Sequence, residues 1–122
     1  VVAWDGSAQT ARAVSDARTF LMDAKRVVLA AGLDEDGREN ESLTVDGMVA
    51  HLSRHDIDAE TVTFPMSEGV DVGRLLLSRS RELAADLIVM GAFHHSRWRE
   101  FILGGVTLTM LEEATIPLFM SH

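Results

Sequence analysis

The chain lacks cysteine, long apolar runs and an excess of positive charge, and each absence excludes a class of protein. Without cysteine there is no disulfide scaffold, thiolate metal site or cysteine nucleophile, so nothing requires an oxidising compartment. No apolar run approaches the roughly 20 residues that span a bilayer. We therefore expect a cytoplasmic protein without a membrane anchor or a redox cofactor.

The charge balance is acidic, with 11 Lys and Arg against 19 Asp and Glu and a formal net charge of -8. Nucleic acids and anionic membranes carry phosphates that a basic surface would have to neutralise. An acidic domain is a poor partner for either. A small phosphate ligand remains compatible with this charge, because a local loop of amides and one or two arginines decides its affinity.

The chain has the length of one domain, which we place at residues 1–122, and its apolar content of 47% is enough for one core. It begins inside an apolar run at Val1, without an initiator methionine. We therefore expect a trimmed domain, either by itself or as one half of a tandem protein.

Apolar runs alternate with amphipathic stretches, a pattern typical of repeated strand–helix–strand units and a parallel sheet. The segments predicted as strands are Val1–Trp4, Arg26–Leu33, Ala59–Phe64, Asp86–Met90 and Ile116–Met120. Those predicted as helices are Ala8–Met22, Leu43–His55, Val70–Leu83 and Val106–Glu113. The sum is one doubly wound α/β domain, with helices on both faces of a five-stranded parallel sheet.

Three local features complete this prediction. Ser7 stands where the N-cap of the first helix belongs. Pro65 should end the third strand, which we place near a sheet edge. The segment Asp34–Glu41 is interpreted as a surface loop, because it is strongly charged and contains a glycine, and a calcium loop is the less favoured alternative because the residue register of such a site is missing.

Two strand ends are informative, because ligands of open parallel sheets bind outside the carboxyl ends of the strands, where strand order reverses. The first strand ends in Trp4-Asp5-Gly6-Ser7, and the fourth in Met90-Gly91. Gly104 and Gly105 open a helix whose free N–H groups favour an anion, and Thr107 adds a hydroxyl in its first turn. The alternative is that these glycines only end a strand and form a turn.

A family resemblance is carried by the segments VVAWDGS, DLIVMGA and HSRWREFILGGVT and by the step of thirteen positions from Gly91 to Gly104. The chain resembles the universal stress protein family over essentially its whole length. The His-Ser-Arg loop and Gly-Gly-x-Thr ending resemble a variant found in tandem-domain members. The resemblance implies the strand order 3-2-1-4-5 and the adenine-nucleotide α-hydrolase-like fold. Many members bind ATP, so the resemblance also implies an ATP site, with magnesium.

The resemblance assigns the site residue by residue. Asp5 matches the acidic residue near the adenosine, and Gly32 falls near the second-strand contact to adenine. Positions of the glycine-rich loop and its flanks match Met90, Gly91, Gly104, Gly105 and Val106.

Two further loop residues extend this site. His94 stands in place of the family's second glycine, where it either adds bulk against the ligand or donates a hydrogen bond to a phosphate. The guanidinium of Arg97 could pair with a phosphate; its alternative partner is the acidic surface.

Other sites are set aside. His51 and His55 have the spacing of a zinc pair on one helix but no obvious third ligand. No Gly-x-Ser-x-Gly elbow supports Ser7 as a nucleophile. A phosphoacceptor domain of similar topology is excluded, because Phe64-Pro65-Met66 occupy the place of its essential aspartate.

The sequence therefore predicts a regulatory stress-response domain that binds an adenine nucleotide and is not an enzyme. The alternative is the same fold without nucleotide binding, acting as an interaction or dimerisation module. Slow ATP hydrolysis, or phosphate transfer to Ser96, is a third hypothesis without an identifiable base. The apolar last strand, Ile116–Met120, predicts pairing with a second domain as a homodimer or within a tandem protein.

Overall fold

Strands and helices alternate along the chain in the computed structural model, which describes residues 1–33, 44–67, 69–92 and 105–122. The strands are β1 (Val2–Trp4), β2 (Val27–Leu33), β3 (Ala59–Pro65), β4 (Ile88–Gly91) and β5 (Leu118–Ser121). The helices are α1 (Ala8–Asp16), α2 (Arg18–Asp23), α3 (Val45–Ser53), α4 (Val72–Glu82) and α5 (Gly105–Glu113). The predicted loop Asp34–Glu41 lies outside the described residues.

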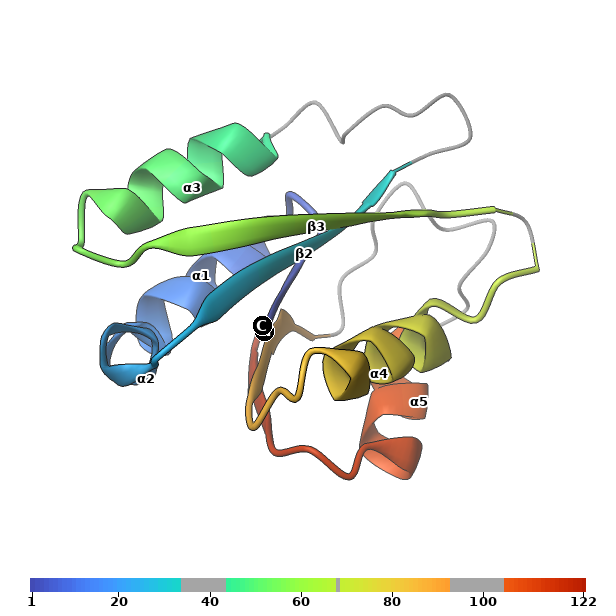
Figure 1. The fold of residues 1–122 in the computed structure, drawn as a ribbon. Helices are drawn as coiled ribbons and strands as arrows, with labels where there is room; N and C mark the ends of the chain where they lie inside the picture. Colours follow the sequence, from blue (N-terminus) through green and yellow to red (C-terminus); the bar gives the residue numbers. More distant parts are fainter. Residues whose placement is uncertain (34–43, 68, 93–104) are drawn as a thin grey trace.

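The strands form one sheet in the order β3-β2-β1-β4-β5, and every neighbouring pair is parallel. Helices α1, α2 and α3 lie on one side of the sheet, and α4 and α5 on the other (Figure 1). The predicted doubly wound architecture and its strand order are thus confirmed. Strand order reverses between β1 and β4, the neighbours from which the chain winds outward in two directions.

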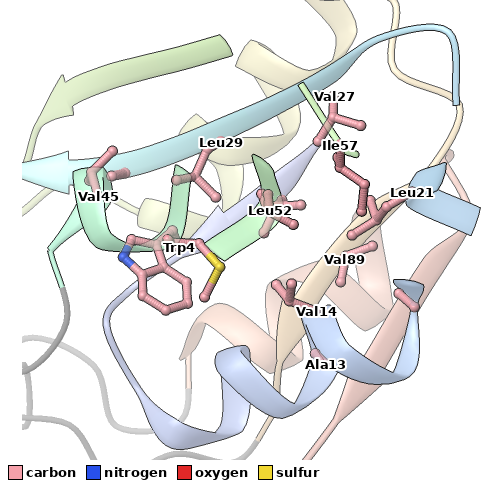
Figure 2. Close-up of a cluster of buried hydrophobic side chains, with 14 residues drawn as sticks. Trp4, Ala13, Val14, Leu21, Val27, Leu29, Val45, Leu52, Ile57 and Val89 are labelled. Carbon is pink, nitrogen blue, oxygen red and sulfur yellow. The ribbon is translucent and has the colours of Figure 1, made fainter. Parts of the chain in front are cut away.

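Two buried clusters hold the helices to the two faces of the sheet, because successive side chains of a strand point to opposite faces. In β2, Leu29 lies in the cluster under α1 and α3, whereas Ala30 lies in the cluster under α4 and α5. Figure 2 shows the first cluster, in which Trp4 and Val89 meet residues of the overlying helices. Burial on both faces explains why the inner strands are continuous apolar runs.

The prediction of a single helix from Ala8 to Met22 is wrong at Ala17. The backbone there takes φ -82° and ψ 3°, which separates α1 from α2. The break is not visible in the sequence pattern, because the N–H of Ala17 still donates to the carbonyl of Ala13 and both residues are fully buried. The apolar stripe therefore continues through the bend.

The third strand continues one residue further than predicted. Pro65 is its last residue, paired with Leu33, and the N–H of Met66 then donates to the carbonyl of Leu33 over 2.8 Å. A proline is tolerated there because β3 lies at the edge of the sheet, as predicted, so its missing N–H breaks no ladder bond.

Helices α4 and α5 are in direct contact. A Cβ built on Gly73 would stand 2.8 Å from Thr109 Cβ, so the close approach of the two helices requires a glycine there. Next to this contact, the Arg74 guanidinium binds the Glu113 carboxylate at 2.7 Å. These hydrogen bonds lower the pKa of the Glu113 carboxyl. The two helices therefore cover their face of the sheet as a connected pair.

Helix α4 ends in a motif that normally contains glycine. The N–H of Ala84 donates to the carbonyl of Arg81, and that of Ala85 to the carbonyl of Ser80, both at 2.9 Å. This pair of bonds defines the Schellman ending, which places the residue after the C-cap in the left-handed region. Ala84 accordingly has φ 52°, a strained value for a residue with a Cβ.

We therefore expect Ala84→Gly to raise the free energy of unfolding. The left-handed conformation costs an L-residue roughly 1–2 kcal/mol, of which the greater freedom of glycine in the unfolded chain offsets about 0.4–1 kcal/mol. The net gain should be about 0.5–1 kcal/mol in urea unfolding. Ala85→Gly is the matched control and should lower stability, because Ala85 has no positive φ. Equal effects of the two substitutions would contradict the strain at Ala84.

Candidate functional site

The turn after β1 is folded by three consecutive residues. Gly6 takes φ 73°, a left-handed conformation that favours glycine. This turns the chain so that the N–H of Ser7 donates to Oδ1 of Asp5 over 2.9 Å. Ser7 is then the N-cap of α1, as predicted, with its hydroxyl accepting from the N–H of Thr10 at 3.1 Å.

Thr10, in the first turn of α1, completes a hydrogen-bonded chain. It is 1% exposed, and its hydroxyl donates to Oδ1 of Asp5 over 2.6 Å. The hydroxyls of Ser7 and Thr10 are 3.1 Å apart. Because the single hydroxyl proton of Thr10 goes to the carboxylate, Ser7 is the donor in this second bond. Asp5 is thereby held by two donors at its Oδ1 atom.

Gly91, at the end of β4, lies against the same helical turn. A Cβ on Gly91 would stand 2.8 Å from both the backbone N and Oγ1 of Thr10, and 3.0 Å from Gln9 Cβ. The sequence suggested that this glycine leaves room for a ligand. In the structure, the space that its side chain would fill is taken by α1, so packing alone already requires a glycine.

These contacts bring two of the predicted site residues together. Strand β1 pairs with β4 through Ala3 and Met90. Thr10 contacts both Asp5, which follows β1, and Gly91, which ends β4. The site therefore lies where strand order reverses, the usual ligand position in an open parallel sheet.

The electrostatics of this corner combine an anion with helix donors. Asp5 lies at the N-terminus of α1, where the unpaired N–H groups and the helix dipole stabilise a negative charge. Nearby, Oε1 of Gln9 is buried and has no hydrogen-bond partner within the described part of the chain. Such an acceptor is unusual in a folded protein.

Helix α5 begins at Gly105, one residue before the predicted start, so Val106 and Thr107 lie in its first turn. Because β4 and β5 are parallel, the connecting helix must run back along the sheet, and its start faces the carboxyl ends of the strands. The starts of α1 and α5 thus approach the same end of the sheet from its two sides.

Gly32 lies in β2, next to β1 in the sheet. A Cβ on Gly32 would stand 2.6 Å from Cγ of Met66, so this side chain covers the position. The sequence predicts Gly32 as a contact to a base; its immediate neighbour in the structure is the flexible thioether of Met66, the residue after β3.

Of the other predicted site residues, His94, Arg97 and Gly104 lie outside the described residues, as does Ser96. Thr10, Gln9 and Met66 were not identified from the sequence. Thr10 had one signal, since a residue three positions after an N-cap reaches back to the preceding turn. Gln9 and Met66 had none, because their positions depend on contacts between distant parts of the chain.

The histidine pair is a packing contact. His51 and His55 lie edge to face, with ring centroids 5.0 Å apart. Across residues 1–33, 44–67, 69–92 and 105–122, no three side chains of the metal-binding types gather into a cation site. None of the helices in these ranges is long and apolar enough to cross a bilayer.

Comparison with known proteins agrees with the fold. The model of the universal stress protein family matches residues 1–122. A search of curated proteins found no match. Among solved structures, a universal stress family protein from Burkholderia pseudomallei is 23% identical with a TM-score of 0.64, covering 98% of this chain and 92% of that one.

Two further structures are similar at lower identity. A universal stress protein in complex with cAMP is 21% identical with a TM-score of 0.61, covering 99% of this chain and 94% of that one. The hypothetical protein MJ0577 is 18% identical with a TM-score of 0.60, covering 98% and 91%. At these identities the structures support the fold alone.

The contact at Gly91 predicts the cost of adding one methyl group. Gly91→Ala should lower the free energy of unfolding by about 1–3 kcal/mol, because the new Cβ meets the backbone of Thr10, which cannot move without shifting α1. Gly32→Ala is the matched comparison and should cost less, because the Met66 side chain can rotate away. Urea unfolding of both variants measures the difference. A smaller loss for Gly91→Ala would show that α1 is not tightly packed there.

Proposed function

The chain belongs to the universal stress protein family, and from this we propose that it binds an adenine nucleotide, ATP, at the carboxyl ends of β1 and β4. The nucleoside contacts Asp5, Gly32 and Met90, and the phosphates lie between Gly91 and the start of α5. Val106 and Thr107 contribute to that helix start, and His94, Arg97, Gly104 and Gly105 complete the loop.

One arrangement carries this proposal: a carboxylate held by two donors after β1, linked through Thr10 to the glycine that ends β4. Asp5 is oriented before any ligand arrives, so little side-chain entropy is lost on binding to a ribose hydroxyl or base amine. The starts of two helices at the same end of the sheet favour the charge of a phosphate chain.

Two further observations support a nucleotide. Gln9, whose Cβ lies against Gly91, has a buried Oε1 without a hydrogen-bond partner among the described residues, and rotation of this side chain would let a ligand donor satisfy it. One structure with the same fold is a universal stress protein in complex with cAMP. Magnesium would enter with the triphosphate, since this ion is usually held by phosphate oxygens and water with few protein ligands.

We propose that the domain is a regulatory module of the cytoplasm, which holds ATP without turning it over. Its role in a stress response would follow from the difference between the bound and free states. We also assign it to the family variant with the His-Ser-Arg loop and Gly-Gly-x-Thr ending, in which two domains are paired in a tandem protein or a homodimer.

The open edge of β5 is the surface proposed for this pairing. The carbonyl of Pro117 accepts from the N–H of Ile88, and that of Ser121 from the N–H of Ala92, the residue after β4. The alternate residues Leu118 and Met120 therefore direct their N–H groups away from β4. Beside this edge, Phe119 contacts Phe20, which is 57% exposed. A second β5 would satisfy the backbone groups and cover the aromatic pair.

Calorimetric titration with ATP and magnesium tests the binding proposal. We expect micromolar binding by the unmodified chain and recovery of intact ATP after hours of incubation. His94→Gly, which restores the family's glycine, is measured beside it. If His94 donates to a phosphate, the substitution weakens binding; if the side chain obstructs the loop, the substitution strengthens it.

The absence of binding by the unmodified chain would overturn the proposal, whether or not His94→Gly restores binding. The same fold would then act as an interaction or dimerisation module. Release of ADP at a rate proportional to protein concentration would instead contradict the proposal that the domain does not hydrolyse ATP.

The pairing proposal predicts that Met120→Pro shifts the chain from dimer to monomer in analytical ultracentrifugation. Proline removes an N–H that points outward and leaves the bonds between β5 and β4 in place. Met120→Ala is the matched control: it also removes the methionine side chain but keeps the N–H, so it should remain dimeric. A dimer of unchanged affinity for Met120→Pro would exclude pairing through this edge.

A further inference from the structure

We propose that Thr10 is the positioning residue of the nucleotide site, because its hydroxyl holds Asp5 in the orientation that binds the nucleoside. This inference rests on the proposed function. It assigns to a buried side chain of α1 a role that neither the sequence pattern nor the family resemblance indicated.

Thr10 binds the Asp5 carboxylate through a short hydrogen bond. The bond from Thr10 Oγ1 to Asp5 Oδ1 is 2.6 Å long, within the short range typical of a hydroxyl and a carboxylate. The second donor to Oδ1 is the backbone N–H of Ser7. Both donors bind the same oxygen, so together they restrict rotation of the carboxylate about its Cβ–Cγ bond.

The surroundings of Thr10 hold its hydroxyl in one position. Its exposed fraction is 1%, so water does not compete for its hydroxyl. The backbone N and Oγ1 of Thr10 lie against Gly91, and the hydroxyl of Ser7 donates to its oxygen. The threonine cannot change rotamer without losing these contacts, and the carboxylate that it holds is equally restricted.

Thr10 lies between the two parts of the proposed site. It touches the residue after β1 and the last residue of β4, the two strands between which the nucleotide is proposed to bind. A single side chain thus sets the relation between the nucleoside contact and the beginning of the phosphate loop. A residue with a purely structural role would stabilise α1 without affecting one part of the ligand more than another.

The experiment compares Thr10→Val and Thr10→Ser. Valine keeps the shape of threonine but cannot donate, whereas serine keeps the hydroxyl. Dissociation constants are measured for ATP, adenosine and inorganic tripolyphosphate, with thermal unfolding to establish that each variant is folded at the temperature used. We expect Thr10→Val to weaken the binding of ATP and of adenosine by roughly tenfold, the effect of one charge-assisted hydrogen bond. Thr10→Ser should bind ATP with an affinity within about twofold of that of the unmodified chain, and the affinity for tripolyphosphate should be the same in all three proteins.

A double-mutant cycle with Asp5→Ala separates positioning from stability. In the Asp5→Ala background, Thr10→Val should cause no further loss of ATP affinity, because the group that it positions is gone. Additive losses would overturn the inference, as would equal weakening of adenosine and tripolyphosphate. ATP binding that is the same in Thr10→Val and the unmodified chain would overturn this inference alone. Failure of the unmodified chain to bind ATP would overturn the proposed function and this inference with it.

Discussion

The contact between the first turn of α1 and the end of β4 is the constraint on which this structure depends. Gly91 and Thr10 are far apart in sequence, yet no side chain fits between them. Through this contact the turn after β1 is fixed to the neighbouring strand β4, and α1 packs against both. Val14 of α1 and Val89 of β4 share one buried cluster for the same reason. The chain winds outward from β1 and β4 in opposite directions, so joining these two strands joins the halves of the domain.

Much of the fold could be predicted from the sequence because parallel strands covered on both faces are continuous apolar runs. Val27–Leu33 and Ile88–Gly91 stand out for this reason, while the order of the strands came from the family resemblance and not from the pattern. The errors have local causes. A change of ψ at Ala17 divides a helix without disturbing its apolar stripe. Pro65 stays in β3 because an edge strand can omit one donor.

The candidate site was predictable to a smaller extent. Asp5 and Gly91 could be named, because a polar residue and a glycine followed two strand ends. Their relation could not be predicted, since it depends on how deeply Thr10 enters the corner between the strands. The same holds for Met66 over Gly32, a contact set by the pairing of β2 with β3. Sequence pattern locates residues along the chain, whereas distances of a few ångströms across it follow from packing.

The pairing of α4 with α5 has a mechanical consequence. Gly73 leaves no space for sliding against Thr109, and the nearby bond between Arg74 and Glu113 ties the helices at a second point. Close-packed surfaces transmit strain instead of absorbing it. A tilt of α5 about its first turn would therefore carry α4 with it. The two helices would move as one unit, and the displacement would be largest at their ends farthest from the carboxyl ends of the strands.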